Sequence, residues 1–287
     1  MCRVKVDSLA KVNLYLEIKK KRSDGYHEIE TLFQRVNLHD TILIEKTHKT
    51  DIQITCNHPA VPIDATNLAY RAAELLFRET GIKVGLKINI DKVIPVAAGL
   101  GGGSSNAASV MQAVNNMCNL GFTKEKLLEL GSKLGADVPF FLLDEPCALG
   151  CGKGDVLEPI KNVPTYWYVI IYPKIHVSSK WAYEHFKLSL TKKKPGATIF
   201  IRALKSANLQ EIAPVLYNDL ASVVGASHKE VQSAEKALRT AGIKAVLLSG
   251  SGPCVFGICQ TKGEAEAVKE RASRKMGDTS IFICRSV

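Results

Sequence analysis

The sequence lacks the spacings of cysteine and histidine that hold zinc or form a redox-active dithiol. Its eight cysteines are scattered over 287 residues, no C-x-x-C pair occurs, and the seven histidines show no zinc-ligand spacing relative to them. Structural zinc sites and redox motifs need such close pairs. We therefore expect reduced, mostly buried thiols and no metal site made from these side chains.

The sequence also has little that would direct it to a membrane. The N-terminus carries no apolar segment typical of a signal peptide. No apolar run approaches the roughly 18 residues of a membrane span. Hydrophobic residues make up 46% of the chain and charged residues 23%, as in ordinary globular proteins. We expect a soluble, cytoplasmic protein without a membrane partner.

Long basic runs with interleaved aromatic residues, which are typical of nucleic-acid-binding surfaces, are missing too. The net charge of +10 nevertheless favours anionic partners: nucleotides, phosphorylated metabolites or nucleic acid. The two basic runs, Lys19–Arg22 and Lys192–Lys194, are short and lie beside expected turns, so we interpret both as solvated loops. A basic nucleic-acid-binding protein stays as an alternative hypothesis, and a steep salt dependence of binding would distinguish it.

The most informative stretch that is present reads P-V-A-A-G-L-G-G-G-S-S-N-A-A, from Pro95 to Ala108. Four glycines in five residues allow positive φ and a close approach of backbone to ligand. A strand is expected before it, over Val84–Val93, and a helix after it, over Ala107–Val114. Ser104–Asn106 would start that helix, where backbone N–H groups attract anions. A strand, a glycine loop and a helix N-terminus in this order predict a phosphate cradle, with a flexible glycine turn as the alternative. No Gly-Lys-Ser/Thr follows the glycines, so the loop is not a Walker loop.

Three further segments each have two readings. Lys11, among apolar neighbours at the start of a strand, is either functional or an edge-strand lysine whose ammonium reaches water. Asp137, in a nearly apolar setting after Gly135, is either functional or a turn residue that caps the next element. Ser249–Gly252 is either part of a site or a tight connection between two strands.

The order of elements predicts an α+β protein, because strands and helices occur without strict β-α-β alternation. A domain boundary is expected near Asn162–Pro164. The expected strands cover Val4–Ser8, Leu14–Ile18, Thr31–Leu38, Thr41–Lys46, Ile52–Thr55, Tyr166–Tyr172, Ala245–Leu248 and Thr279–Cys284. The expected helices cover Leu68–Glu79, Lys124–Leu134, Ser179–Phe186, Ala197–Lys205, Leu209–Ala213, Lys229–Ala241 and Glu264–Lys275, and Ala148–Gly154 is expected to be a glycine-rich turn.

Taken together and in this order, the glycine stretch and the three other segments resemble the signature motifs of the GHMP kinases, over essentially the whole chain. The run R-S-D-G-Y-H-E-I, from Arg22 to Ile29, resembles more closely the members that phosphorylate a cytidine-diphosphate-linked methylerythritol. The resemblance implies two domains. Residues 1–162 would form an N-terminal α/β domain like that of a ribosomal protein, and residues 163–287 a ferredoxin-like C-terminal α+β domain.

The resemblance also implies roles for individual residues. Asp137 would be the general base and Lys11 its partner, with ATP and Mg²⁺ as cofactors and either Ser104 or Ser105 reaching the metal. The residues implied to bind ATP are Pro95, Val96, Ala97, Ala98, Gly99, Leu100, Gly101, Gly102, Gly103, Ser104, Ser105 and Asn106, with Asn67 and Lys92 as weaker candidates. The residues implied to bind the acceptor are Asn13, Tyr26, His27, Phe33, Lys153 and Tyr183.

Other readings stay open at this stage. Another GHMP kinase, acting on mevalonate, phosphomevalonate or homoserine, is the main alternative, and an inactive homologue is a third. The sequence is compatible with a monomer or a homodimer that acts on a small molecule and binds no nucleic acid.

Overall fold

The computed structural model describes residues 2–188 and 194–287 and divides the chain into two compact units. The first unit holds the described residues up to Ala10, together with His39–Val96 and Gly101–Asp144; the second holds Lys11–Leu38, Ala97–Leu100 and Glu145–Val287. Each unit is therefore built from three separate pieces of chain. The division at residue 162 stays a prediction.

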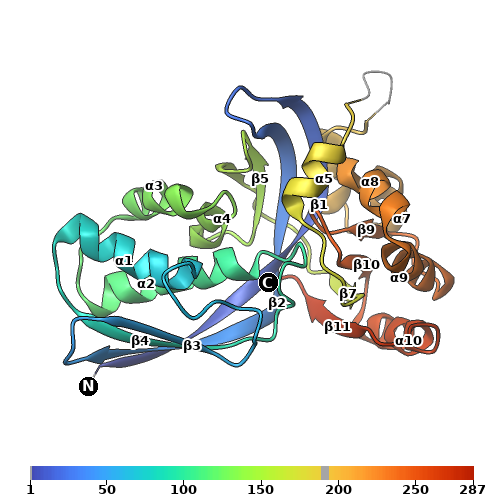
Figure 1. The fold of residues 1–287 in the computed structure, drawn as a ribbon. Helices are drawn as coiled ribbons and strands as arrows, with labels where there is room; N and C mark the ends of the chain where they lie inside the picture. The colour runs from blue at the N-terminus through green and yellow to red at the C-terminus, as the bar shows by residue number, and fades with distance from the viewer. Residues whose placement is uncertain (1, 189–193) are drawn as a thin grey trace. The chain divides into compact units, whose positions relative to one another are not determined.

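The elements follow one another from the N-terminus as drawn in Figure 1. The strands are β1 (Arg3–Lys21), β2 (His27–Thr47), β3 (Ile52–Cys56), β4 (Gly85–Asp91), β5 (Cys147–Cys151), β6 (Val156–Pro159), β7 (Trp167–Tyr172), β8 (Tyr217–Asn218), β9 (Val246–Leu248), β10 (Val255–Cys259) and β11 (Ser280–Arg285). The helices are α1 (Leu68–Thr80), α2 (Gly102–Met117), α3 (Lys124–Leu134), α4 (Val138–Leu142), α5 (Ser179–His185), α6 (Ala197–Lys205), α7 (Leu209–Ile212), η1 (Ala213–Val215), α8 (Asp219–Ser227), α9 (Lys229–Thr240) and α10 (Lys262–Ser273).

The first unit combines strands with a group of four helices. β4 pairs antiparallel with the second half of β2 and parallel with β3. Alternate residues of β4 are buried, which is the pattern of a strand with one face on a core. In this unit α1 packs against α2, and α2 packs against α4, beside β3 and β4 (Figure 1). The N-terminus of α2 and the turn before α4 are thereby brought into one unit.

The second unit contains an antiparallel sheet in the order β11-β7-β10-β9. Its central strands are almost wholly buried. A cluster of buried apolar side chains from α8, α9 and α10 covers this sheet, and these helices lie beside it in Figure 1. The first half of β2 also pairs with β5, β5 pairs with β6, and β1 pairs with β8.

The observed elements confirm the α+β class and correct several local predictions. Each pair of strands predicted at the N-terminus is a single long strand, β1 or β2. Ala148–Gly154 was expected to be a turn, but its first part belongs to β5. Helix α2 begins at Gly102, so Ser104–Asn106 lie inside its first turns rather than before it. Helix α8 was not predicted.

The interpretation of the second basic run as a solvated loop is wrong for Lys194; Lys192 and Lys193 lie outside the described residues. The Lys194 ammonium donates to the Ile18 carbonyl oxygen at 3.1 Å and to the Asp219 carboxylate at 2.9 Å, and its side chain is 14% exposed. Asp219 is buried in the first turn of α8, where an unpaired carboxylate would be costly. The lysine therefore neutralises a buried charge.

No helix in the described part of the chain is both long and apolar enough to span a bilayer.

Candidate active site

The first half of the glycine stretch lies against the loop Ser249–Gly252 in the second unit. Gly99 adopts a φ of +78°, and a Cβ atom there would come within 2.0 Å of the Ser249 carbonyl oxygen. Only glycine satisfies both the left-handed backbone and this close approach. The Ser249 hydroxyl donates to the Gly99 carbonyl oxygen at 3.0 Å, and the Cys254 N–H donates to the Ala98 carbonyl oxygen at 3.3 Å. The loop Ser249–Gly252 does connect two strands, but it also holds the glycine stretch.

The second half of the stretch forms the N-terminus of α2 in the first unit. Gly101 precedes the helix with a φ of +70° and, as a glycine, provides no side-chain cap. The first turn also contains no acidic residue. Uncapped N–H groups at a helix N-terminus favour an anion. This half of the stretch can therefore hold phosphate oxygens by its backbone.

A buried ion pair stands beside this helix start. The Lys92 ammonium pairs with the carboxylate of Asp40, which is fully buried. A Cβ atom on Gly102 would lie 2.7 Å from the Lys92 ammonium nitrogen, so the cation lies against the first turn of α2. Burial lowers the pKa of Lys92, and the attraction of Asp40 opposes that change. Lys92 thus has a structural partner at the place where an ATP-binding role was predicted.

Asp40 is a residue that the sequence reasoning missed. Besides pairing with Lys92, its carboxylate accepts hydrogen bonds from the backbone N–H groups of Val93 and Ile94, both at 2.8 Å. It also accepts one from the Asn106 side-chain amide at 2.9 Å. Asp40 therefore ties the chain before the glycine stretch to helix α2. The one feature of the sequence that could have pointed to Asp40 is its position as an acidic residue between two predicted apolar strands.

The two serines of the glycine stretch differ in their surroundings. Ser105 is 1% exposed, and its hydroxyl is 2.7 Å from that of Ser8, which also accepts from the Asn106 amide. Ser104 lies toward the turn between α3 and α4, because its hydroxyl is 3.9 Å from where a Cβ of Gly135 would be. Ser105 is thus used to hold the helix, and Ser104 faces the segment that carries Asp137.

Asp137 immediately precedes helix α4 and is partly buried. Its backbone is in the right-handed helical region, with φ −82° and ψ −14°. Its side chain does not cap α4 with any hydrogen bond among the described residues. The reading of Asp137 as a capping residue is therefore wrong, and the structure leaves its catalytic role as the prediction to be tested.

Lys11 is the start of a buried polar cluster in the second unit. It is only 4% exposed, so the reading of a surface lysine that reaches water is wrong. Its ammonium donates to the Asn13 side-chain oxygen at 2.5 Å and lies 5.3 Å from the centre of the Phe33 ring. A Cβ atom on Gly250 would lie 3.7 Å from the same nitrogen. Lys11, Asn13 and the loop Ser249–Gly252 therefore meet at one place.

Four of the predicted acceptor-binding residues make one ring–ring contact and one ammonium–ring contact, and Phe33 is buried. The His27 and Tyr183 rings are stacked, with centroids 5.3 Å apart and planes 25° apart. The Lys153 ammonium lies 5.1 Å from the centre of the Tyr26 ring, which is 59% exposed. Phe33 is 1% exposed and packs against Gly150 of β5 and Gly154 of the turn that follows it. The structure places all of these, with Asn13, in the second unit.

The remaining ATP candidate, Asn67, caps helix α1. Its side-chain oxygen accepts from the Ala69 N–H at 2.9 Å, and its amide donates to the Pro62 carbonyl oxygen at 2.7 Å. Its polar side-chain groups are thus already used within the fold, and a role toward ATP stays a prediction.

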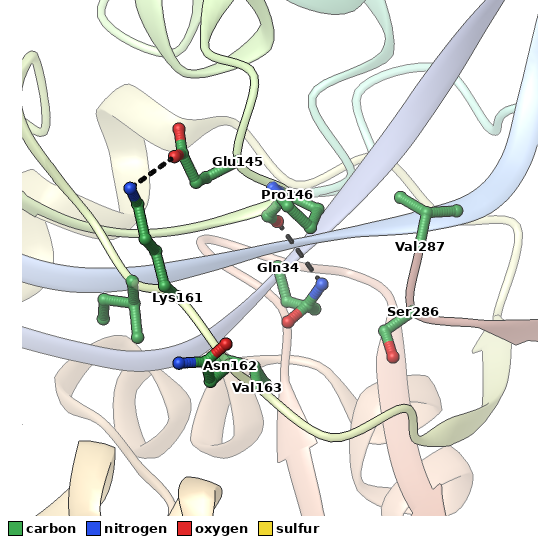
Figure 2. Close-up of a pocket in the computed structure, with 9 residues that line it drawn as sticks. Gln34, Glu145, Pro146, Lys161, Asn162, Val163, Ser286 and Val287 are labelled. Carbon is green, nitrogen blue, oxygen red and sulfur yellow. Dashed lines mark hydrogen bonds and ion pairs between the residues drawn. The ribbon is translucent and has the colours of Figure 1, made fainter.

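A cavity of about 430 Å³ in the second unit is lined by none of the predicted site residues. Figure 2 shows the Lys161–Glu145 ion pair at this cavity and the Gln34 amide pointing to the Pro146 carbonyl oxygen. Its lining residues are Gln34, Glu145, Pro146, Ile160, Lys161, Asn162, Val163, Ser286 and Val287.

The described residues contain no group of three or more histidine, cysteine, aspartate or glutamate side chains that could hold a metal. All eight cysteines are free thiols, and burial raises the pKa of Cys254, which follows the loop Ser249–Gly252. Asp137 belongs to the first unit and Lys11 to the second, so their predicted pairing stays a prediction.

Comparison with protein families places the GHMP kinase N-terminal domain at residues 67–145 and the GHMP kinase C-terminal domain at residues 200–278. Two similar relatives are 4-diphosphocytidyl-2-C-methyl-D-erythritol kinases. That of Alkaliphilus metalliredigens is 40% identical over 273 residues, covering 95% of this chain and 94% of its own. That of Citrifermentans bemidjiense is 43% identical over 268 residues, covering 93% and 94%.

Two solved structures are also similar to this chain. A crystal structure of 4-(cytidine 5'-diphospho)-2C-methyl-D-erythritol kinase matches with a TM-score of 0.83 and 31% identity, covering 98% of this chain and 99% of the other. A homoserine kinase from Cytophaga hutchinsonii matches with a TM-score of 0.78 at 19% identity, covering 99% and 94%, which is a likeness of fold.

Proposed function

Because the chain belongs to the 4-diphosphocytidyl-2-C-methyl-D-erythritol kinases, a family of GHMP kinases, we propose that it transfers the γ-phosphoryl group of ATP to the 2-hydroxyl of 4-diphosphocytidyl-2-C-methyl-D-erythritol, a step of isoprenoid biosynthesis. The observation that carries this proposal is the similarity of about 40% identity to relatives of that name over nearly the whole chain.

The backbone of the glycine stretch and the start of α2 hold the phosphates of ATP in this proposal. The support is the uncapped helix N-terminus after Gly101 and the absence of Cβ atoms at three successive positions. The Lys92 ammonium lies against Gly102 in this turn, paired with the Asp40 carboxylate. A nucleotide would thereby be held mainly by backbone groups, without a Walker lysine.

Asp137 is the proposed general base and accepts the proton of the attacking hydroxyl. A carboxylate in hydrogen-bond reach of an alcohol can perform this transfer in phosphoryl-transfer enzymes. Lys11 is proposed to stabilise the negative charge that develops on the transferred group. Its support is a buried ammonium oriented by Asn13.

Mg²⁺ is the proposed metal, although the described residues hold no group of three or more acidic side chains for it. Mg²⁺ in kinases is held largely by substrate phosphates and water with one or two protein oxygens, so a dedicated cluster of acidic residues is not needed. Of the two candidate hydroxyls, Ser105 is buried in contact with Ser8, which favours Ser104. The metal would neutralise charge on the phosphate oxygens.

The acceptor is proposed to bind in the second unit. The stacked pair of His27 and Tyr183 and the exposed ring of Tyr26 offer aromatic faces for cytosine, with Lys153 supplying positive charge. Stacking on aromatic side chains is worth about 1–3 kcal/mol per base in nucleic-acid complexes. Asn13 is assigned to the methylerythritol and Phe33 to the floor of the site.

We expect ATP consumption in a coupled ADP-release assay to depend on the cytidine-linked acceptor. Mevalonate, phosphomevalonate and homoserine, tested at the same concentration, should give only background rates, because they have no base for the aromatic groups to recognise. Turnover of any of these three without the cytidine-linked acceptor would assign the chain to another GHMP kinase activity.

Acceptor affinity is expected to fall in mild acid. Burial, and then the charge of Lys21, lower the pKa of His27 below its ordinary value of 6.5, so the ring is neutral at neutral pH. A neutral ring can both donate and accept, and protonation removes the acceptor. We expect the Kd of cytidine diphosphate to rise as pH falls through the His27 pKa, by more than the ligand's own titration accounts for.

Isothermal titration from pH 7.5 to about pH 5 measures this effect. A His27→Gln variant is the control, because its amide does not titrate but the ligand's own titration is unchanged. Equal acid losses in wild type and variant would remove His27 from cytosine recognition.

We also propose a cytoplasmic monomer or homodimer that binds no nucleic acid. Eight free thiols fit a reducing compartment. Filter binding to duplex DNA over a salt series tests whether the protein binds nucleic acid.

A further inference from the structure

Asn13 is held in one orientation by a chain of buried hydrogen bonds. Its side-chain oxygen accepts from the Lys11 ammonium at 2.5 Å, and its amide nitrogen donates to the Thr31 hydroxyl at 2.8 Å. The Thr31 hydroxyl in turn donates to the Tyr15 carbonyl oxygen at 2.8 Å. All four residues are at most 4% exposed.

The direction of this chain is fixed by the chemistry of its two ends. An ammonium group can only donate, and a backbone carbonyl oxygen can only accept. The single hydroxyl proton of Thr31 is used on Tyr15, so Thr31 can offer Asn13 only an acceptor. The amide of Asn13 must therefore turn its nitrogen to Thr31 and its oxygen to Lys11.

A rotated amide would have a high cost at this position. Turning Asn13 by half a turn would point its NH₂ group at the Lys11 ammonium and its oxygen at a hydroxyl without a free proton. Both hydrogen bonds would be lost in a buried place, where unsatisfied polar groups are expensive. The Lys11 ammonium and the Thr31 hydroxyl thus fix the same orientation of the Asn13 amide, one through its oxygen and the other through its nitrogen.

We propose that Thr31 is a positioning residue for the phosphoryl transfer: its hydroxyl orients Asn13, and Asn13 orients the Lys11 ammonium. The proposal rests on the proposed function, because it concerns the rate of that reaction. No contact of Thr31 with either substrate is needed.

Three substitutions separate the hydroxyl from the shape of the side chain. Thr31→Val keeps the volume and removes the hydroxyl; we expect kcat to fall about 10-fold or more with KM values within about 2-fold. Thr31→Ser keeps the hydroxyl and should restore most of kcat. Thr31→Cys has a side chain of similar size that is only a weak acceptor, so its kcat should resemble that of the valine variant. It replaces the valine variant if that variant does not fold.

A matched control exists on the surface of the first unit. The Thr55 hydroxyl also accepts from an asparagine amide, that of Asn89, at 2.9 Å, but both residues are exposed. Thr55→Val should leave kcat unchanged. A loss in Thr31→Ser as large as in Thr31→Val, or no loss in Thr31→Val, would overturn the proposal.

A second measurement does not depend on turnover. The side-chain amide signals of Asn13 in a ¹⁵N NMR spectrum, assigned with an Asn13→Asp variant, should shift and exchange faster in Thr31→Val but not in Thr31→Ser. If wild type were inactive toward the cytidine-linked acceptor while these signals behaved as expected, the proposed function would fail and the positioning of Asn13 would stand. Unchanged signals in Thr31→Val would contradict the positioning itself.

Discussion

Replacing Asp137 by asparagine is expected to lower kcat by roughly 10²–10⁴-fold, the contribution typical of a general base. Asparagine has nearly the same shape but cannot accept the hydroxyl proton. Because Asp137 does not cap helix α4 through its side chain, the change should leave the local fold in place. ATP affinity should therefore stay close to that of wild type, since the phosphates are assigned to backbone groups.

Single-turnover kinetics and ATP titration of the same protein measure the two effects separately. Asp278→Asn is a suitable control, because that carboxylate is 88% exposed and pairs with Lys174 at the surface. Wild-type kcat in the Asp137 variant would show that another group takes the proton. Loss of ATP binding together with activity would instead make Asp137 part of the nucleotide site.

Replacing Asp40 by asparagine should destabilise the protein by about 3–5 kcal/mol, the usual cost of removing one partner of a buried ion pair. The Lys92 ammonium would be left buried without a counter-charge, and the asparagine NH₂ group would face donors. Asp40 accepts from two backbone N–H groups and from Asn106, so the glycine stretch should lose order as well. Urea unfolding gives the loss of stability.

The surface offers a matched control for this change too. Asp91 on β4 accepts from the Asn57 amide at 2.6 Å, but it is exposed. Asp91→Asn should change the unfolding free energy by less than about 1 kcal/mol. If Asp40→Asn cost no more than Asp91→Asn, the buried pair would contribute nothing to the fold.

Elements with local signals at both ends could be predicted closely. Helix α3 matches its predicted bounds because the Thr123 side chain accepts from the Lys126 N–H at one end and Gly135 follows at the other. The site motifs could be predicted in the same local way, since glycine runs and their flanking residues are contiguous. The buried position of Lys11 could not be predicted in this way. It depends on the neighbouring Asn13 and also on Gly250, which lies more than 200 residues away along the chain.

The errors in the strands have a common physical cause. The predicted strands stopped around Lys11 and Asn13 in one case and before Asp40 in the other, because polar residues interrupt the apolar alternation. In the structure these residues are buried: Lys11 donates to Asn13, while Asn13 and Asp40 make hydrogen bonds with Thr31 and Asn106 on other elements. β5 was predicted as a turn because it is rich in glycine, but at Gly150 a Cβ atom would come within 2.8 Å of the Phe33 ring. The prediction of strands from apolar alternation therefore failed where long-range polar contacts or close packing stabilise the strand instead.

The two units are interwoven along the chain, since the backbone passes from one to the other at five points: after residues 10, 38, 96, 100 and 144. β1 and β2 each run through such a point without a break. No single cut therefore yields a fragment with one complete unit, and neither unit can be exchanged as a cassette between related proteins by one recombination event. The four residues Ala97–Leu100 make this plain: a fragment that kept the rest of the second unit without them would lose the partners of Ser249 and Cys254.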